Sequence, residues 1–172
     1  MLNEAFTQVD LDPGMTQGGI AGMSNIEAEP ESYIVESRYG PLTFTPDQVV
    51  TMGKSVLGFP HLTRFGLAKL PSQQDGTLVL MQSLEEAGTS FPCFGLDLHN
   101  PLIEEKDLLA TLESLSIKPE DCAILSILTV REEAGKTVMS INLRAPIFVD
   151  SSRRMAWQVV LSNPRYPIRH TL

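Results

Sequence analysis

The clearest pattern along the chain is an alternation over 137–143, with Met139, Ile141 and Leu143 on one face and Val138, Ser140 and Asn142 on the other. A period of two places every second side chain on the same face, so this stretch predicts a half-buried β-strand. Pro146 lacks a backbone N–H and restricts the residue before it, so the strand should bend, end or lie on an edge there. An apolar run follows at 147–149. Together these features predict a corner, at which one sheet folds over onto itself.

Further strand patterns run through most of the chain after residue 32. Short apolar or alternating runs predict strands at 33–38, 42–44, 65–70, 77–83, 91–96, 122–130 and 153–161. Residues 46–52 suit either a strand or a single helical turn, and 131–136 predict a hairpin loop. The order predicts one mostly antiparallel β domain of about eight to ten strands. A closed or partly open barrel is the first choice of architecture, and a two-layer sandwich is the alternative.

The last predicted strand contains the single tryptophan of the chain. Met155, Trp157 and Val159 occupy alternate positions, with Arg, Ala, Gln and Val residues on the other face. A period of two predicts that the face with the larger apolar side chains points inward. We therefore expect Trp157 to be buried together with Met155 and Val159.

Residues 103–115 predict the one substantial helix. Leu108, Leu112 and Leu115 recur at spacings of four and three, with Leu109 beside them. Acidic residues crowd the first turn, where the helix dipole favours them. We expect the leucine stripe to face the core rather than a partner, because a surface helix must cover the sheet.

The net charge of −8 is unevenly distributed. Residues 1–32 contain six acidic side chains and no Lys or Arg, whereas the remaining chain has 15 acidic and 13 basic side chains, so the two parts carry −6 and −2. The absence of apolar periodicity predicts a disordered acidic extension at 1–32, which either only keeps the protein soluble or attracts a basic partner. Direct nucleic-acid binding is not expected, because neutralising phosphates requires a basic patch.

No pattern in the chain predicts an active site. The three histidines are far apart, and none has metal-ligand spacing from a cysteine or another histidine. The adjacent carboxylates Glu85–Glu86 and Glu104–Glu105 are more typical of solvated pairs than of an acid–base couple. We therefore expect no enzyme activity and no metal or organic cofactor, with a site assembled from distant loops as the alternative.

Cysteine usage and hydropathy indicate the compartment. Cys93 and Cys122 lie among apolar residues and predict reduced core thiols. The N-terminus lacks the basic start and apolar core of a signal peptide, and no apolar run approaches membrane-spanning length. We expect a cytoplasmic protein that does not bind membranes and is a monomer when free.

Five short stretches, in the same order, resemble the FliW family of flagellar assembly factors. The most characteristic is Asn-Leu-Arg-Ala-Pro-Ile at 142–147. The others are Leu-Gly-Phe with its flanking apolar residues in 56–67, Met-Gln-Ser-Leu at 81–84, Gln-Val-Val-Leu at 158–161 and Tyr-Pro-Ile-Arg-His at 166–170. The resemblance covers 33–170, and the acidic extension departs from it. The segment 95–101 also departs from the family pattern.

The resemblance implies a compact β-barrel-like fold for 33–172 and a function in binding without turnover. The resemblance also implies two mutually exclusive partners, flagellin and the RNA-binding carbon storage regulator CsrA. We then expect the free protein to bind CsrA and stop it repressing flagellin translation, and cytoplasmic flagellin to capture the protein and so release CsrA. The alternative from the residues alone is a small β-barrel enzyme or ligand carrier, which would need an internal pocket with converging polar groups.

Six residues in the resembling stretches are candidates for partner binding: Gln82, Asn142, Arg144, Gln158, Tyr166 and Arg169. Gln82 follows an apolar run and is either a strand-end residue that faces water or a partner contact. Asn142 and Arg144 should project from the same face if the strand is regular to that point. A local alternative is that Asn142 bonds the backbone at the corner and that Arg144 pairs with a nearby acid.

Overall fold

The computed structural model describes residues 30–70, 78–99 and 102–172. The predicted extension therefore lies outside the described residues except for 30–32, which are exposed. The described part contains eleven strands and one α-helix, α1 (Glu105–Leu115). The strands are β1 (Tyr33–Ser37), β2 (Gly40–Phe44), β3 (Val49–Lys54), β4 (Arg64–Lys69), β5 (Leu78–Ser83), β6 (Ser90–Leu96), β7 (Cys122–Glu133), β8 (Lys136–Ile141), β9 (Ile147–Asp150), β10 (Met155–Gln158) and β11 (His170–Thr171).

Seven of these strands form a closed barrel in the order β7-β6-β5-β4-β3-β10-β9. The barrel closes where β9 returns to pair with the first residues of β7, so that Cys122 lies opposite Asp150 and Leu125 opposite Ile147. All neighbouring pairs are antiparallel except β3 with β10. The mostly antiparallel barrel is confirmed, and the sandwich alternative is not the observed architecture.

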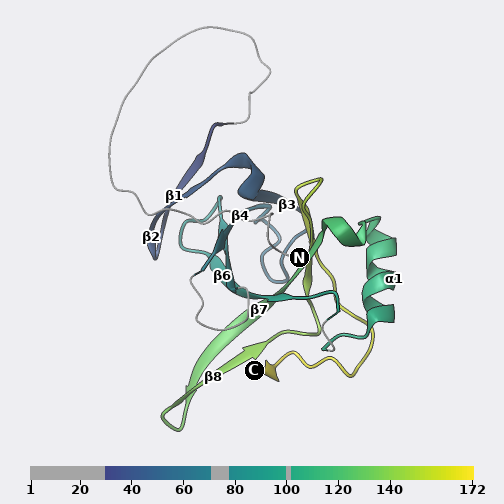
Figure 1. Ribbon diagram of the computed structural model, residues 1–172. Helices are drawn as coiled ribbons and strands as arrows, with labels where there is room; N and C mark the ends of the chain where they lie inside the picture. Colours follow the sequence, from purple (N-terminus) through teal and green to yellow (C-terminus); the bar gives the residue numbers. More distant parts are fainter. Residues whose placement is uncertain (1–29, 71–77, 100–101) are drawn as a thin grey trace, which may run out of the picture.

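Strand β7 is longer than the pattern predicted, because it belongs to two parts of the fold. Its first residues close the barrel, and its second half pairs with β8 in a hairpin that extends away from the barrel (Figure 1). The predicted loop at 131–136 is a two-residue turn at Ala134 and Gly135, with φ of 50° and 76°. Such turns match the twist of the flanking strands and so allow pairing to continue almost to the tip.

Three apolar clusters cover both faces of the barrel wall. The barrel interior is filled by Val50, Met52, Val56, Leu62, Phe65, Leu67, Val79, Met81, Cys93, Ala123, Leu125, Ile147, Val149 and Ala156. A second cluster lies between the wall and α1 and includes Leu108, Leu112, Ile124, Phe148 and Tyr166. The third contains Val35, Leu42 and Phe44 of the β1–β2 hairpin together with Val49, Ala68 and Leu80 of the wall. Burial on both faces explains the almost unbroken apolar run in β7.

The inward face of β10 is opposite to the predicted one. Ala156 and Gln158 are buried, whereas Met155 and Trp157 are half-buried. The indole lies outside the barrel against Gly53, where an added Cβ would be 2.1 Å from the indole Nε1. The prediction that Trp157 is buried with Met155 and Val159 is therefore wrong. Closure of the barrel places Ala156 and Gln158 on the inner face, and Trp157 is half-buried on the outer face.

Several local predictions are confirmed. Strand β8 ends at Ile141 and β9 begins at Ile147, which is the predicted corner. Residues 46–52 contain both alternatives, a 3-10 turn (Pro46–Gln48) followed by β3. Cys93 and Cys122 are free thiols, and burial raises the pKa of each to about 12, so they are poor nucleophiles.

Candidate partner-binding surfaces

The corner between β8 and β9 is shaped by its asparagine. The Asn142 Oδ1 accepts hydrogen bonds from the backbone N–H groups of Arg144 and Ala145, both at 3.1 Å. A side chain that accepts from the residue two positions on mimics a backbone turn. The local alternative for Asn142 is thus the observed one, and the regular strand needed for a shared face with Arg144 ends before this point.

Arg144 binds the C-terminal segment rather than an acid. Its guanidinium donates to the carbonyl oxygens of Leu161 at 3.2 Å and Asn163 at 3.1 Å. The predicted pairing with a nearby carboxylate is wrong, because the corner lies beside a turn whose carbonyl groups need donors. The side chain is half-buried and fixes residues 161–164 against the corner.

Gln158 joins the corner to the loop between β3 and β4. Its Oε1 accepts from the Leu57 N–H at 2.7 Å, and its Nε2 donates to the Ala145 carbonyl at 3.1 Å. The side chain is 2 % exposed, so both backbone groups depend on it for their hydrogen bonds. The sequence order of these segments gave no sign that one amide would connect them.

Tyr166 connects the C-terminal segment to the start of α1. Its hydroxyl donates to Asp107 Oδ2 at 2.5 Å and accepts from the Glu104 N–H at 3.0 Å. Asn163 Nδ2 also donates to the same Asp107 oxygen, at 3.0 Å. The hydrogen bond from Tyr166 lowers the pKa of Asp107, and burial followed by the Asp107 contact raises the pKa of Tyr166.

The remaining two candidates lie apart from this group. Gln82 is fully buried, and its Nε2 donates to the carbonyls of Ser83, Ala87 and Thr89 at 3.0–3.1 Å, so it holds the turn between β5 and β6. The interpretation of Gln82 as a residue facing water is wrong. Arg169 is exposed just before β11. The structure therefore brings four candidates together around the C-terminal segment and leaves Arg169 on the surface.

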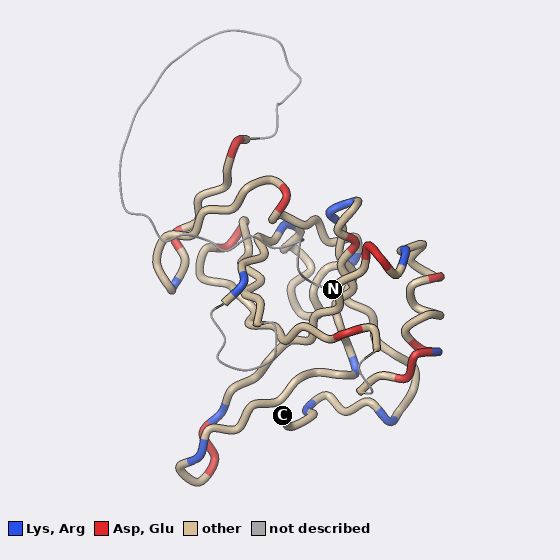
Figure 2. The backbone as a smooth tube through the Cα atoms, viewed as in Figure 1, with Lys and Arg blue, Asp and Glu red and all other residues tan. Residues whose placement is uncertain are grey.

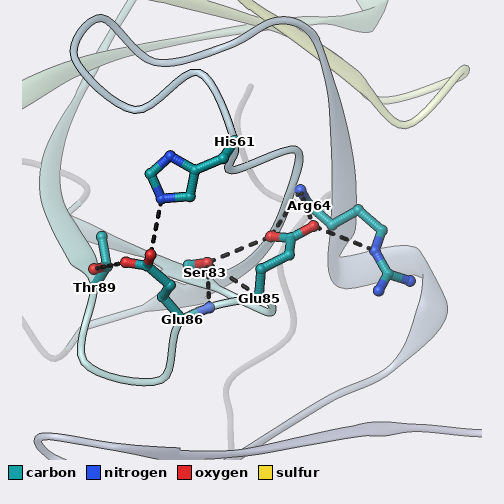
Figure 3. Close-up of polar contacts among 6 residues, drawn as sticks. All are labelled: His61, Arg64, Ser83, Glu85, Glu86 and Thr89. Atoms are coloured by element: carbon teal, nitrogen blue, oxygen red, sulfur yellow. Dashed lines mark hydrogen bonds and ion pairs between the residues drawn. The ribbon is translucent and has the colours of Figure 1, made fainter.

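A surface network joins the β5–β6 turn to the loop before β4 (Figure 3). Glu86 lies 2.8 Å from His61 Nε2 and accepts from Thr89 Oγ1 at 2.9 Å, and the hydrogen bond with His61 lowers the pKa of Glu86. Glu85 instead accepts from the Arg64 N–H at 3.0 Å and the Thr63 hydroxyl at 2.9 Å. Both glutamates are exposed, as expected for a solvated pair, and each one fixes a different part of the loop.

The Ser83 hydroxyl takes part in this network as a turn residue. It accepts from the N–H groups of Glu85 and Glu86 at 3.1 and 3.0 Å and donates to Glu85 Oε2 at 3.4 Å, and no hydrogen bond joins it to His61 (Figure 3). A serine nucleophile needs a base that is available to take its proton, whereas the Glu85 carboxylate already accepts from the Thr63 hydroxyl and the Arg64 N–H. The arrangement stabilises a turn at one end of the barrel rather than activating a hydroxyl.

Comparison with known proteins decides the family. The family model described as FliW protein matches residues 33–172. The chain belongs to the FliW family. The flagellar assembly factor FliW of Syntrophus aciditrophicus is 30 % identical over 140 residues, covering 81 % of this chain and 86 % of the relative. That of Clostridium beijerinckii is 29 % identical, covering 78 % and 93 %. The predicted resemblance is confirmed, and the protein is a flagellar assembly factor.

A solved structure has the same fold. The crystal structure of a flagellar assembly factor FliW superposes with a TM-score of 0.61 at 24 % sequence identity, covering 80 % of this chain and 95 % of that chain. The overall fold is therefore shared with a FliW protein of distant sequence. Among residues 30–70, 78–99 and 102–172, no group of three His, Cys, Asp or Glu side chains could hold a metal ion. No helix in those ranges is long and apolar enough to cross a membrane.

The outer surface of this FliW protein contains features that sequence reasoning missed. Arg153 pairs with the buried Asp150 at 2.5 Å, donates to the carbonyls of Leu115 and Ser116 at the end of α1, and lies 5.3 Å from the centre of the Trp157 ring. The sequence signal for this cluster was the short separation between Asp150 and Arg153, which are three residues apart. Large apolar side chains are exposed at Ile34, Tyr39, Leu57, Leu109, Val130, Val160, Ile168 and Leu172.

Proposed function

We propose that this protein binds flagellin in the cytoplasm and, when it is not bound to flagellin, binds and antagonises a CsrA-type translational regulator. Flagellin synthesis would then follow the amount of free FliW protein. The observation that carries the proposal is membership of the FliW family over the whole of residues 33–172. The role is binding without turnover, and it requires neither metal nor organic cofactor.

The filled barrel supports recognition at the outer surface. The interior is occupied by a continuous cluster of buried apolar side chains. Phe59 and Phe91 pack against this cluster, and the centroids of their two rings are 5.2 Å apart. A ligand carrier would need an internal cavity with converging polar groups. The buried Gln158 at the barrel wall uses both its amide atoms for backbone groups. A partner would therefore meet loops, α1 and the outer strands.

Charge favours a basic partner over nucleic acid. The chain carries −8 overall, which opposes direct binding to phosphate backbones. An RNA-binding regulator is expected to be basic, so its potential is complementary to this chain. In this proposal the partner binds RNA, and this protein controls the partner by binding to it.

The central test is a three-component binding experiment with purified full-length protein, a CsrA-type regulator and flagellin. We expect each partner to form a complex in size-exclusion chromatography and calorimetry, and flagellin to displace the regulator. The free protein should elute as a monomer. A chain that binds neither partner would overturn the proposal, and simultaneous binding of both would overturn the partner switch.

Among the six candidate residues, we propose that Arg169 contacts a partner directly and that the others maintain the surface. Arg169→Ala should weaken binding of one partner by about tenfold or less, with a stability change within about 0.5 kcal/mol. Gln158→Ala is the matched contrast, because it leaves the buried Ala145 carbonyl and the part-buried Leu57 N–H without their partner and should cost about 1–3 kcal/mol of unfolding free energy. Calorimetry and urea unfolding separate the two effects, and unchanged affinities for Arg169→Ala would contradict its role.

A further inference from the structure

The outer face of α1 has one exposed leucine between two glutamates. Glu105, Leu109 and Glu113 follow one another at intervals of four residues, so they lie along one line of the helix surface. Leu109 is 49 % exposed, whereas Leu108 and Leu112 are buried against the barrel wall. The leucine stripe thus faces the core as expected, and Leu109 is the helix leucine that projects to the outside.

The acids of this region fall into two groups. Glu104 pairs with Lys106 at 2.7 Å and Arg165 at 3.0 Å, and Asp107 accepts from Tyr166 and Asn163. These inner carboxylates hold the helix to the C-terminal segment. The carboxylates of Glu105 and Glu113 make no hydrogen bond or ion pair with any described residue. The helix dipole favours Glu105 in the first turn, but it does not favour Glu113 in the last turn, so helix stability accounts for only one of the two.

The helix presents this face in a fixed position. Tyr166 holds its first turn, and Arg153 Nη2 donates to the carbonyls of Leu115 at 3.0 Å and Ser116 at 3.2 Å at its end. Two buried leucines fix the inner side. A preorganised surface loses little conformational entropy when a partner binds, which is why rigid elements make effective interfaces.

Charge around the helix selects the chemistry of the occupant. Residues 104–121 contain six acidic and two basic side chains, a net charge of −4, and Figure 2 shows the acids in red along α1 and at the turn after it. Arg165, which pairs with Glu104, and Arg153, which binds carbonyls at the helix end, offset part of this charge. Protein interfaces combine an apolar centre with a charged rim that matches the partner. Leu109 provides such a centre, and Glu105 and Glu113 provide the rim.

We propose that this face, defined by Glu105, Leu109 and Glu113, binds a basic protein segment that presents an apolar side chain to Leu109. The inference rests on the proposed function, and of the two partners it assigns the basic one, the CsrA-type regulator, to α1. Flagellin would use another surface. Displacement of the regulator by flagellin then proceeds through steric overlap of the bound partners or a conformational change, not through competition for Leu109.

The test measures binding of full-length variants to a CsrA-type regulator and, separately, to flagellin. Leu109→Ala should weaken regulator binding by about tenfold or more, as expected for a central apolar contact. Glu105→Gln with Glu113→Gln should slow association about three- to tenfold at low salt, and the difference should shrink at high salt. Neither change should alter flagellin affinity or the urea midpoint by more than the experimental error.

Matched controls use exposed residues of the β7–β8 hairpin. Glu132→Gln with Glu133→Gln changes the net charge by the same amount, and Val130→Ala removes an apolar side chain that is 54 % exposed. Equal losses for the control and α1 variants would overturn the proposal, as would unchanged regulator affinity in the α1 variants. If the α1 variants lose only flagellin binding, α1 binds flagellin and the assignment to the regulator is wrong. A wild-type chain that does not bind the regulator would instead overturn the proposed function itself.

Discussion

At the scale of single residues, polar side chains decide the shape of the surface more than the sequence pattern indicated. Gln82, Asn142 and Gln158 were candidates for partner contacts, and each uses its amide for backbone groups at a turn or corner. A glutamine after an apolar run has the same local pattern whether it faces water or a buried carbonyl. Only the fold distinguishes the two, because it decides whether the side chain is buried beside backbone carbonyls. The buried Gln82 Nε2 finds three carbonyls, whereas its Oε1 has no hydrogen-bond partner among the described residues.

The contact between Gly53 and Trp157 gives a prediction at this scale. Gly53→Ala would place a methyl group 2.1 Å from the indole Nε1, so the ring must move away from the strand. We expect a loss of about 1–3 kcal/mol in unfolding free energy, typical of overpacking. Urea unfolding and Trp157 emission would report the change.

Gly88→Ala is the control for this prediction, because nothing lies within 4 Å of its added Cβ. In the background Trp157→Ala, which removes the obstructing ring, the cost of Gly53→Ala should largely disappear. A cost that is the same in both backgrounds would show that the indole is not what resists the methyl group.

At the scale of elements, α1 is held by polar contacts at both ends and by leucines along one side. Local periodicity and the acidic first turn predicted the helix itself. Its attachment to the C-terminal segment through Tyr166 and Asp107 was not predictable, because 59 residues separate the two side chains. The same holds for Arg153, which satisfies carbonyls at the helix end that the helix itself leaves unpaired.

The contact between Tyr166 and Asp107 predicts a pH dependence. The hydrogen bond lowers the pKa of Asp107 in the folded state, so its stabilising effect is present above the ordinary aspartate pKa and is lost as pH falls through the lowered folded value. Tyr166→Phe should therefore destabilise the protein at pH 7, and the difference from wild type should narrow below about pH 4.

Urea midpoints of wild type and Tyr166→Phe between pH 3 and pH 8 would check this dependence. Asn163, Lys106 and Arg165 also act on Asp107, so Asp107→Asn in the same series shows the part that does not come from Tyr166. A difference that grows on acidification would contradict the assigned direction.

At the scale of the whole molecule, one filled barrel carries two covers on its outer wall, α1 with the C-terminal segment and the β1–β2 hairpin. The structure places acidic residues along α1, and the sequence places −6 in residues 1–32, most of which lie outside the described residues. Both regions are negatively charged, so their electrostatic potentials add and together attract a basic partner.

Deleting residues 1–32 tests the contribution of the acidic extension. We expect an almost unchanged melting temperature and, if the extension attracts the regulator, slower association at low salt. The difference should fade between about 0.1 and 0.5 M salt, because the Debye length drops below about 10 Å. Stopped-flow association rates measure the effect. Equal rates at low salt would leave the extension with a solubilising role, and a large loss of thermal stability would contradict the predicted disorder.

The sequence by itself determined the class of fold, the positions of most strands, the helix and the corner at 142–146. These features depend on local rules: a period of two or 3.6, a proline without an N–H, and an asparagine that closes its own turn. The short FliW-like stretches also sufficed for the family. Such signals are carried by neighbouring residues, so no knowledge of distant contacts was needed.

Only the tertiary structure decided which face of β10 points inward and which polar side chains are buried. A strand of the barrel wall packs against apolar clusters on both sides, so its sequence pattern does not show which face points inward. Pairing of β10 with β3 and β9 placed Ala156 inside the barrel and Trp157 outside it. Closure likewise brought Gln158 to Leu57, 101 residues away. Packing and hydrogen-bond satisfaction act between segments that meet only when the barrel closes, which is why they determine the surface available to partners.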